Sequence, residues 1–178
     1  MKFKFLLVFL IMFLINNKLM ADNNLTLFDF SFKDIDGNHV NLEKFRGKPI
    51  LVVNTASRCG YTPQYANLQN LFLEYKDTDL TIIATTSNSF YQEYEDTEEI
   101  KKICLVNYGV GFVTSSPMDV KGSNAHPIYA WLYDSYDKQP KWNFFKFLFN
   151  RDGNLVKSWS SMTKPDSIKI TNQIDKLI

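Results

Sequence analysis

The 178-residue sequence is poor in the residues that bind metals and nucleotides. Its two cysteines and two histidines are too few for a tetrahedral zinc site unless all four converge or carboxylates contribute. No glycine-rich loop of the GxGxxG or GxxxxGK(S/T) type is present, which argues against nucleotide chemistry. The formal net charge of +1 creates no basic field for nucleic acid. We therefore expect no metal, no cofactor and no nucleic-acid partner.

The spacing of the cysteines excludes two further kinds of site. Cys59 and Cys104 form no Cys-x-x-Cys motif, so dithiol exchange between neighbouring cysteines is excluded. Position 63 is Pro63, so a copper-delivery site of the Cys-x-x-x-Cys type is excluded as well. Whatever chemistry the thiols perform must therefore use single, separated cysteines.

The sequence has ample material for a folded core. Hydrophobic residues make up 45% of it, and the aromatic residues include 15 Phe, 9 Tyr and 3 Trp. This composition is that of an ordinary globular protein and argues against disorder. The length fits one domain, or at most two small ones.

The first 21 residues have the pattern of a secretory signal. Lys2 and Lys4 precede 11 uninterrupted apolar residues, Phe5 to Ile15, and Ala21 offers a small residue at a cleavage point. The apolar run is well short of the ~20 residues that span a bilayer. We expect cleavage after Ala21, export to the periplasm and a single mature domain, residues 22–178. A retained membrane anchor is the alternative.

Hydrophobic periodicity predicts an α/β fold with a mixed central sheet flanked by helices. Two continuous apolar runs are typical of buried strands, and helices with apolar stripes follow them. The strand–helix–strand order implies a parallel pair, and a late hairpin adds antiparallel strands. The expected strands are 27–32, 40–42, 49–54, 80–85, 144–150 and 154–159, and the expected helices are 63–75, 96–107, 127–133 and 165–178, with a capping box at Asp96 and Glu99.

Cys59 occupies a favourable position for chemistry. It follows the first buried strand in a loop that precedes a helix. In open α/β sheets ligands bind at this edge, and nearby amides and a helix N-terminus stabilise a thiolate. A thiolate at this position is a nucleophile. A structural disulfide to Cys104 is the alternative for an exported protein with two cysteines.

Several segments resemble the glutathione peroxidase family. The stretch from Asn54 to Thr62, NTASRCGYT, is similar to that family's active-site segment, and KWNFFKFL, which begins at Lys141, is similar to its Trp-Asn-Phe-x-Lys-Phe-Leu segment. Shorter matches lie at 98–100 and 124–129 in the same order. The resemblance covers 27–178. It implies a thioredoxin-like fold and the activity of a selenium-independent thiol peroxidase.

The resemblance also implies roles for individual residues. Cys59 matches the cysteine or selenocysteine that attacks a hydroperoxide and becomes a sulfenic acid. In the family a Trp, an Asn and a Gln donate hydrogen bonds to the reacting atoms, and Trp142 and Asn143 match the first two. The family's Gln position holds Ser89 here. Ser89 and Gln92 are both candidates for the third donor.

Cys104 matches a cysteine that resolves the sulfenic acid in family members that use thioredoxin-like reductants. It lies on the helix predicted after Asp96, and its role is to condense with Cys59 into a disulfide. The resemblance implies hydrogen peroxide or organic and lipid hydroperoxides as substrates, and a thioredoxin-like protein or glutathione as reductant. The short segment 132–142 lacks the insertion of oligomeric members, so we expect a monomer.

Two other functions are compatible with the same residues. The first is a non-catalytic module of the same fold with a structural Cys59–Cys104 disulfide. The second is a thiol oxidase that uses peroxide to oxidise partner proteins. Peroxide consumption by the reduced protein separates the first alternative from both enzymes.

Overall fold

The computed structural model describes residues 25–178, so the predicted signal peptide (1–21) and its cleavage point lie outside the described residues. None of the helices in residues 25–178 has the length and apolar character needed to span a membrane. The described chain forms η1 (Leu27–Asp29), β1 (Ser31–Lys33), β2 (His39–Asn41), η2 (Leu42–Phe45), β3 (Ile50–Thr55), α2 (Gln64–Glu74), β4 (Thr81–Thr86), α3 (Thr97–Lys101), η3 (Lys102–Asn107), β5 (Val113–Thr114), α4 (Pro127–Tyr136), β6 (Lys146–Phe149), β7 (Leu155–Trp159) and α5 (Ile168–Ile174).

A mixed five-stranded sheet forms the centre of the molecule. Its strand order is β5-β4-β3-β6-β7, with β3, β4 and β5 parallel and β6 and β7 antiparallel to their neighbours. All six residues of β3 are buried, as the continuous apolar run predicts for a strand covered on both faces. The mixed sheet flanked by helices is therefore confirmed.

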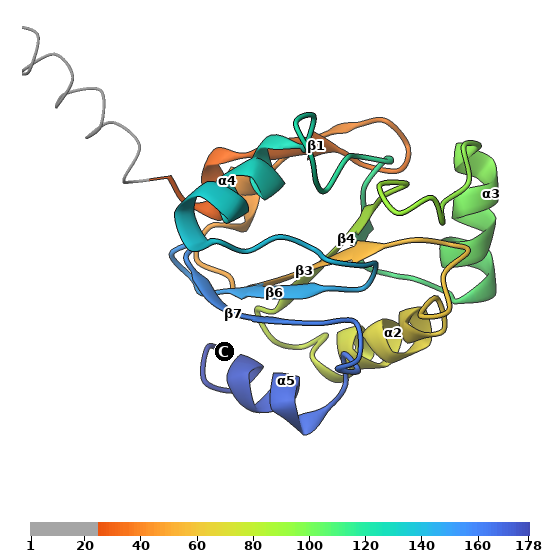
Figure 1. Ribbon diagram of the computed structural model, residues 1–178. Helices are drawn as coiled ribbons and strands as arrows, with labels where there is room; N and C mark the ends of the chain where they lie inside the picture. Colours follow the sequence, from red (N-terminus) through yellow and green to blue (C-terminus); the bar gives the residue numbers. More distant parts are fainter. Residues whose placement is uncertain (1–24) are drawn as a thin grey trace, which may run out of the picture.

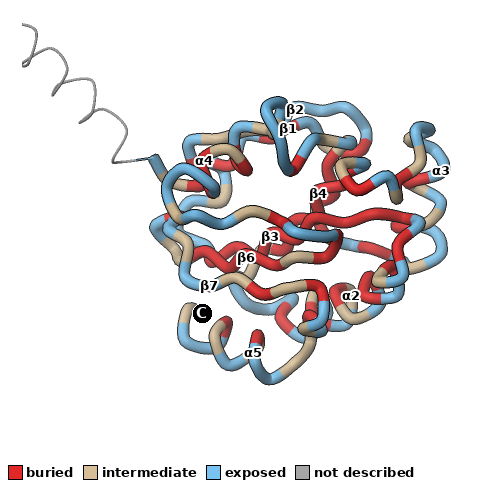
Figure 2. The backbone as a smooth tube through the Cα atoms, viewed as in Figure 1, coloured by how far each residue is buried: buried red, intermediate tan, exposed pale blue. Residues whose placement is uncertain are grey.

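Two hydrophobic clusters, one on each face, hold the layers together. Figure 1 shows α2 and α5 on one face of the sheet, and α4 with the β1–β2 hairpin on the other. Alternate residues of β3 point to opposite faces, so Leu51 and Val53 join the α2 side while Ile50 and Val52 join the α4 side. In Figure 2 the buried chain runs through this sheet and the exposed chain surrounds it.

The carboxyl ends of β3 and β4 position the candidate site. Both strands run parallel, so the loops that follow them leave the sheet at the same edge, beside α3 (Figure 1). The loop after β3 leads into α2, whose buried face contains the predicted Leu68 and Leu71. Tyr75, which ends the predicted apolar stripe, is also buried. This rigid strand–loop–helix unit supports Cys59.

The helix predicted over 96–107 forms, but its second half is π-helical. Asp96 caps the start of α3 by accepting from the amide of Glu98 at 2.9 Å, so the predicted capping box with Glu99 is wrong. The segment η3 continues the helix with wider π turns. The apolar spacing of Ile100, Ile103 and Cys104 fits either geometry, so the sequence pattern does not distinguish them.

Other boundaries differ from prediction for local reasons. Strand β6 begins at Lys146 rather than Phe144, because Phe144 has a φ of 62° and cannot continue a strand. Helix α4 extends to Tyr136 and ends where Asp137 adopts the left-handed conformation. Strand β5 was not predicted: it has two residues, too few for periodicity to reveal.

Candidate active site

Cys59 lies in a tightly hydrogen-bonded loop between β3 and α2. Its side chain is buried, with 6% of its surface exposed. The amide of Tyr61 donates to the Cys59 Sγ at 3.4 Å, and the Cys59 amide donates to Thr62 Oγ1 at 3.0 Å. The Thr62 hydroxyl in turn donates to the Ala56 carbonyl at 2.9 Å. The sulfur therefore lies in a loop whose backbone supplies a hydrogen-bond donor to it.

Asn143 is fully buried and is fixed from two sides. Its Nδ2 donates to Gln92 Oε1 at 3.1 Å, and its carbonyl accepts from the Ser161 hydroxyl at 2.5 Å. The Gln92 carbonyl accepts from the amide of Arg58, the residue before Cys59, at 2.9 Å. Gln92 therefore links Asn143 to the Cys59 loop. The second hydrogen of the Asn143 amide group makes no hydrogen bond within residues 25–178.

Trp142 is placed beside the same strand end by Asn54. The side chain of Asn54 donates to the Trp142 carbonyl at 3.0 Å and accepts from the Phe145 amide at 3.0 Å. The indole is 40% exposed and packs against Phe90 with ring centroids 5.3 Å apart. Asn54 thus clamps the Trp142–Asn143 pair to β3. This function of Asn54 was not predicted, although the residue begins the motif that contains Cys59.

The two candidates for the third donor have different surroundings. The Ser89 hydroxyl contacts Ser87 at 3.0 Å, accepts from the Val120 amide at 3.0 Å and donates to Asp119 at 3.4 Å. Ser87 directly follows β4, and Asp119 and Val120 belong to the connection between β5 and α4. Gln92, by contrast, touches Asn143 directly. The structure brings Gln92, and not the Ser89 side chain, into the hydrogen-bonded group around Asn143.

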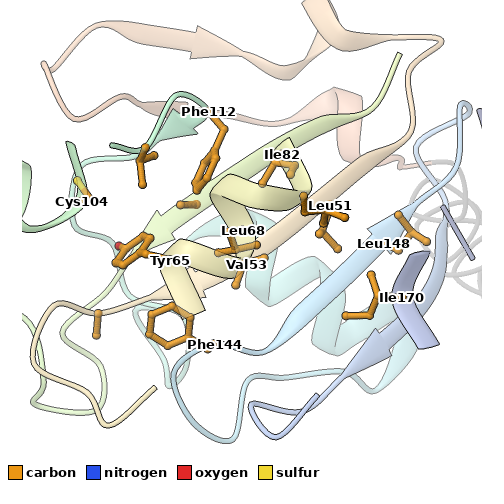
Figure 3. Close-up of a cluster of buried hydrophobic side chains, with 14 of the residues drawn as sticks. Leu51, Val53, Tyr65, Leu68, Ile82, Cys104, Phe112, Phe144, Leu148 and Ile170 are labelled. Carbon is orange, nitrogen blue, oxygen red and sulfur yellow. The ribbon is translucent and has the colours of Figure 1, made fainter. Parts of the chain in front are cut away.

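Cys104 is buried within η3 and shares one hydrophobic cluster with Cys59. Figure 3 shows Cys104 on the same side of this cluster as Tyr65 of α2. Burial raises the pKa of the Cys104 thiol to about 11. Both cysteines are free, so no disulfide joins them in this structure.

Two buried charged residues near the site were missed because their roles depend on contacts distant in sequence. Glu93 is 3% exposed, and its Oε1 accepts from the amides of Ser57 at 3.1 Å and Tyr94 at 2.9 Å. Burial raises its pKa, and its contacts with Ser57 and Tyr94 oppose the rise.

Among residues 25–178 no group of three or more His, Cys, Asp or Glu side chains is arranged to hold a metal ion.

Lys146 is the second buried charged residue. Its Nζ donates to Gln64 Oε1 at the start of α2 and to the carbonyls of Thr163 at 2.7 Å and Ser161 at 3.4 Å. Ser161 also holds the carbonyl of Asn143. Lys146 therefore joins the helix after Cys59 to the loop that supports Asn143. Burial lowers the pKa of Lys146 to about 7.

We predict that Lys146 makes folding stability depend on pH. The unfolded chain holds a proton on this lysine up to its ordinary pKa of 10.5, whereas the folded chain releases it near pH 7. Stability should therefore rise with pH between about 7 and 10, by up to about 1.4 kcal/mol per pH unit. Urea unfolding at pH 7 and pH 9 should show this rise relative to Lys146→Met. The wild type and Lys146→Met share all their other titrating groups. Parallel plots of unfolding free energy against pH for the two proteins would therefore refute the lowered pKa of Lys146.

Comparison with known proteins finds a matching family, relatives of similar sequence and a solved structure of similar fold. Residues 27–133 match the family described as glutathione peroxidase. A hydroperoxy fatty acid reductase from Synechocystis is 40% identical over 169 residues, covering 89% of this chain and 99% of that protein. A glutathione peroxidase-like peroxiredoxin from Schizosaccharomyces pombe is 41% identical over 157 residues, covering 85% and 98%. The crystal structure of Trgpx in its apo form has a TM-score of 0.70 and 34% identity, covering 86% and 95%. The thioredoxin-like fold is thereby confirmed.

Proposed function

Because this chain belongs to the glutathione peroxidase family, we propose that Cys59 is the residue that reacts with peroxide and that Cys104 resolves the product. The chain is a thiol peroxidase that uses peroxide and a thiol reductant. The observation that carries the assignment of Cys59 is its buried, amide-lined position, linked through Gln92 to Asn143.

The first chemical step is a displacement at oxygen. The Cys59 thiolate attacks one oxygen of the hydroperoxide, the O–O bond breaks, and the second oxygen leaves as water or an alcohol after taking a proton. Cys59 becomes a sulfenic acid. The leaving oxygen develops negative charge, so donors aimed at it accelerate the step. The indole N–H of Trp142 and the free amide hydrogen of Asn143 are suited to this task.

The second step joins the two cysteines. Cys104 displaces hydroxide from the Cys59 sulfenic acid and forms a disulfide, which requires the two Cα atoms to come within ~7 Å. The π-helical segment around Cys104 supports this role, because π turns are frequent at functional sites. Leu105 and Val106 in the same segment are exposed, so its outer face has few contacts to lose when it moves.

The specific partners are part of this proposal. A resolving cysteine favours a thioredoxin-like protein with two thiols as reductant over glutathione, because a disulfide is reduced by dithiol exchange. Hydrogen peroxide and lipid hydroperoxides are the proposed substrates; one relative is named for hydroperoxy fatty acids. We also propose that the protein acts as a monomer and is exported to the periplasm, on the basis of the short 132–142 segment and the pattern of residues 1–21.

We predict that Cys104→Ser separates the two steps. The variant should still react once with peroxide at a rate close to that of the wild type, because Cys59 and its donors are unchanged. Turnover with reduced thioredoxin should fall on the order of 10²-fold, the scale of losing a catalytic group. A sulfenic acid on Cys59 should persist and be trapped by dimedone. Full thioredoxin-dependent turnover in Cys104→Ser would contradict the resolving role.

A matched comparison of reductants distinguishes the proposed peroxidase from the thiol oxidase. Peroxide consumption is measured with thioredoxin and with glutathione at equal thiol concentration, using wild type and Cys104→Ser. The proposal expects faster wild-type turnover with thioredoxin. If both support little turnover while oxidised partner proteins accumulate, the thiol oxidase is the better description.

A further inference from the structure

Several buried polar atoms without hydrogen-bond partners belong to the segments that form the candidate site. Among residues 25–178 six side-chain atoms are in this state, and one of them, in Ser167, lies away from the segments that form the site. Each such atom costs about 1–3 kcal/mol, so each one calls for a physical explanation. The other five are Thr55 Oγ1, Ser57 Oγ, Tyr65 OH, Glu93 Oε2 and Asn143 Oδ1.

Glu93 is the acid in this group. It is the one carboxylic acid among residues 25–178 whose side chain is buried. One of its oxygens is fixed to the Cys59 loop by the amide of Ser57, and its own amide donates to Asn88 Oδ1 at 3.1 Å. The other oxygen, Oε2, is buried and unpartnered. Two backbone amides therefore fix one oxygen of the carboxylate, while the other oxygen has no backbone donor.

The charge of Glu93 acts on two titratable groups, Cys104 from η3 and Tyr65 from α2. Burial is the largest cause that raises the pKa of both groups, and the charge of Glu93 raises it further. Tyr108 also raises the pKa of Tyr65. Figure 3 shows Tyr65 and Cys104 on the same side of the core. The guanidinium of Arg58, the residue before Cys59, lies over the Tyr94 ring, 5.4 Å from its centroid. Glu93 is thus fixed to the Cys59 loop through Ser57, and its charge acts on the Cys104 thiol.

The resolving step needs a proton acceptor at this place. A thiol with a pKa of about 11 is ionised in only about one molecule in 10⁴ at pH 7. The thiolate, not the thiol, attacks sulfur. Leaving hydroxide also needs a proton. A single group that takes the proton from one sulfur and delivers it to the departing oxygen serves both needs.

We propose that Glu93 is the proton acceptor and donor of the resolving step, an inference that rests on the function proposed above. Glu93 Oε2 takes the proton from the Cys104 thiol while the Cys104 sulfur forms a bond to the Cys59 sulfur. The S–O bond of the sulfenic acid breaks, and its electron pair leaves with the hydroxyl group. Glu93 returns the proton to that hydroxyl group, which departs as water. The electron pair of the Cys104 sulfur becomes the S–S bond, and the carboxylate is regenerated.

Glu93→Gln tests the proposal with little disturbance of the fold. The carbonyl oxygen of a glutamine accepts the same two amide hydrogen bonds from Ser57 and Tyr94, but it cannot take up a proton. The matched control is Glu95→Gln, which removes an exposed acid from the same segment. The reduced proteins are mixed with one equivalent of hydrogen peroxide, quenched at set times and examined by intact mass. Sulfenic acid and disulfide are then counted separately.

We expect the sulfenic acid to form in Glu93→Gln within about threefold of the wild-type rate and to resolve about 10²-fold more slowly. Raising the pH should partly restore the resolving rate, because the Cys104 thiol then ionises without help; a merely structural defect would not respond in this way. Glu95→Gln should behave as wild type. Resolution of Glu93→Gln at the wild-type rate would overturn the inference while leaving the proposed function intact.

Two further outcomes are decisive. If Cys59 is not oxidised in the wild type, the proposed function fails and the inference fails with it. If Glu93→Gln does not fold, Glu93→Asp replaces it: the shorter carboxylate keeps a proton acceptor farther from Cys104. Slower resolution in that variant with normal oxidation of Cys59 supports the proposal, and unchanged resolution overturns it.

Discussion

Replacing Cys59 with serine is expected to lower peroxide consumption on the order of 10³-fold or more, the scale of losing a nucleophile. A serine hydroxyl is not ionised at neutral pH, so no anion is present to attack the peroxide oxygen. The rate of peroxide loss with excess reductant measures the effect directly. Retained turnover in Cys59→Ser would place the reacting group elsewhere.

The structure indicates that this variant will fold. The hydrogen bonds that shape the loop use the backbone of Cys59, which accepts from the Thr62 amide at 2.9 Å and donates to the Thr62 hydroxyl. Serine preserves both. The thermal unfolding midpoint of Cys59→Ser should therefore lie close to that of wild type, and Cys104→Ser supplies a control that retains the first oxidation.

The second large effect is expected from Asn143→Ala. Losing one donor to developing negative charge typically lowers the rate about 10²–10³-fold, and a fall of this size is expected for the first oxidation of Cys59. The Ser161 hydroxyl bonds to the backbone carbonyl of Asn143, so that support of the loop survives the substitution. Stopped-flow measurement of sulfenic acid formation checks the prediction.

Gln92→Ala provides the matched comparison for Asn143. It removes the partner that orients the Asn143 amide but leaves the amide itself in place. A fall of about tenfold is expected, smaller than that of Asn143→Ala, because the donor remains but is less well oriented. Equal falls in the two variants would mean that both residues serve only to hold the loop. An Asn143→Ala variant that reacts as fast as wild type would remove Asn143 from the mechanism.

The central sheet was predictable because its strands have strong local signals. Apart from Asn54, the residues of Ile50–Thr55 and Thr81–Thr86 are all apolar or β-branched, and nearly all of them are buried. The weak elements were not predictable. Strand β5 exists because Val113 and Thr114 pair with β4, which is a tertiary contact with no local pattern. The π-helical form of η3 is likewise hidden, because its apolar spacing fits an ordinary helix.

The candidate site likewise contains residues that the sequence identifies and residues that it does not. Cys59, Trp142 and Asn143 lie in two short motifs, so the sequence identifies them, although their roles remain predictions. Glu93 and Lys146 depend on partners far along the chain: Glu93 meets Ser57 36 positions away, and Lys146 meets Gln64 82 positions away. A charged residue in a sequence gives no sign that folding will bury it. Lys146 lies within the KWNFFKFL segment, but only the fold reveals that Lys146 and Glu93 are buried.

The most direct test of the central claim is the thiol count and intact mass of the reduced protein before and after one equivalent of hydrogen peroxide. The proposed two-cysteine mechanism predicts that both free thiols disappear within seconds and that the mass falls by about 2 Da, because a disulfide forms and no oxygen is retained. Two thiols that persist for minutes in the presence of peroxide would contradict the mechanism and favour a non-catalytic module.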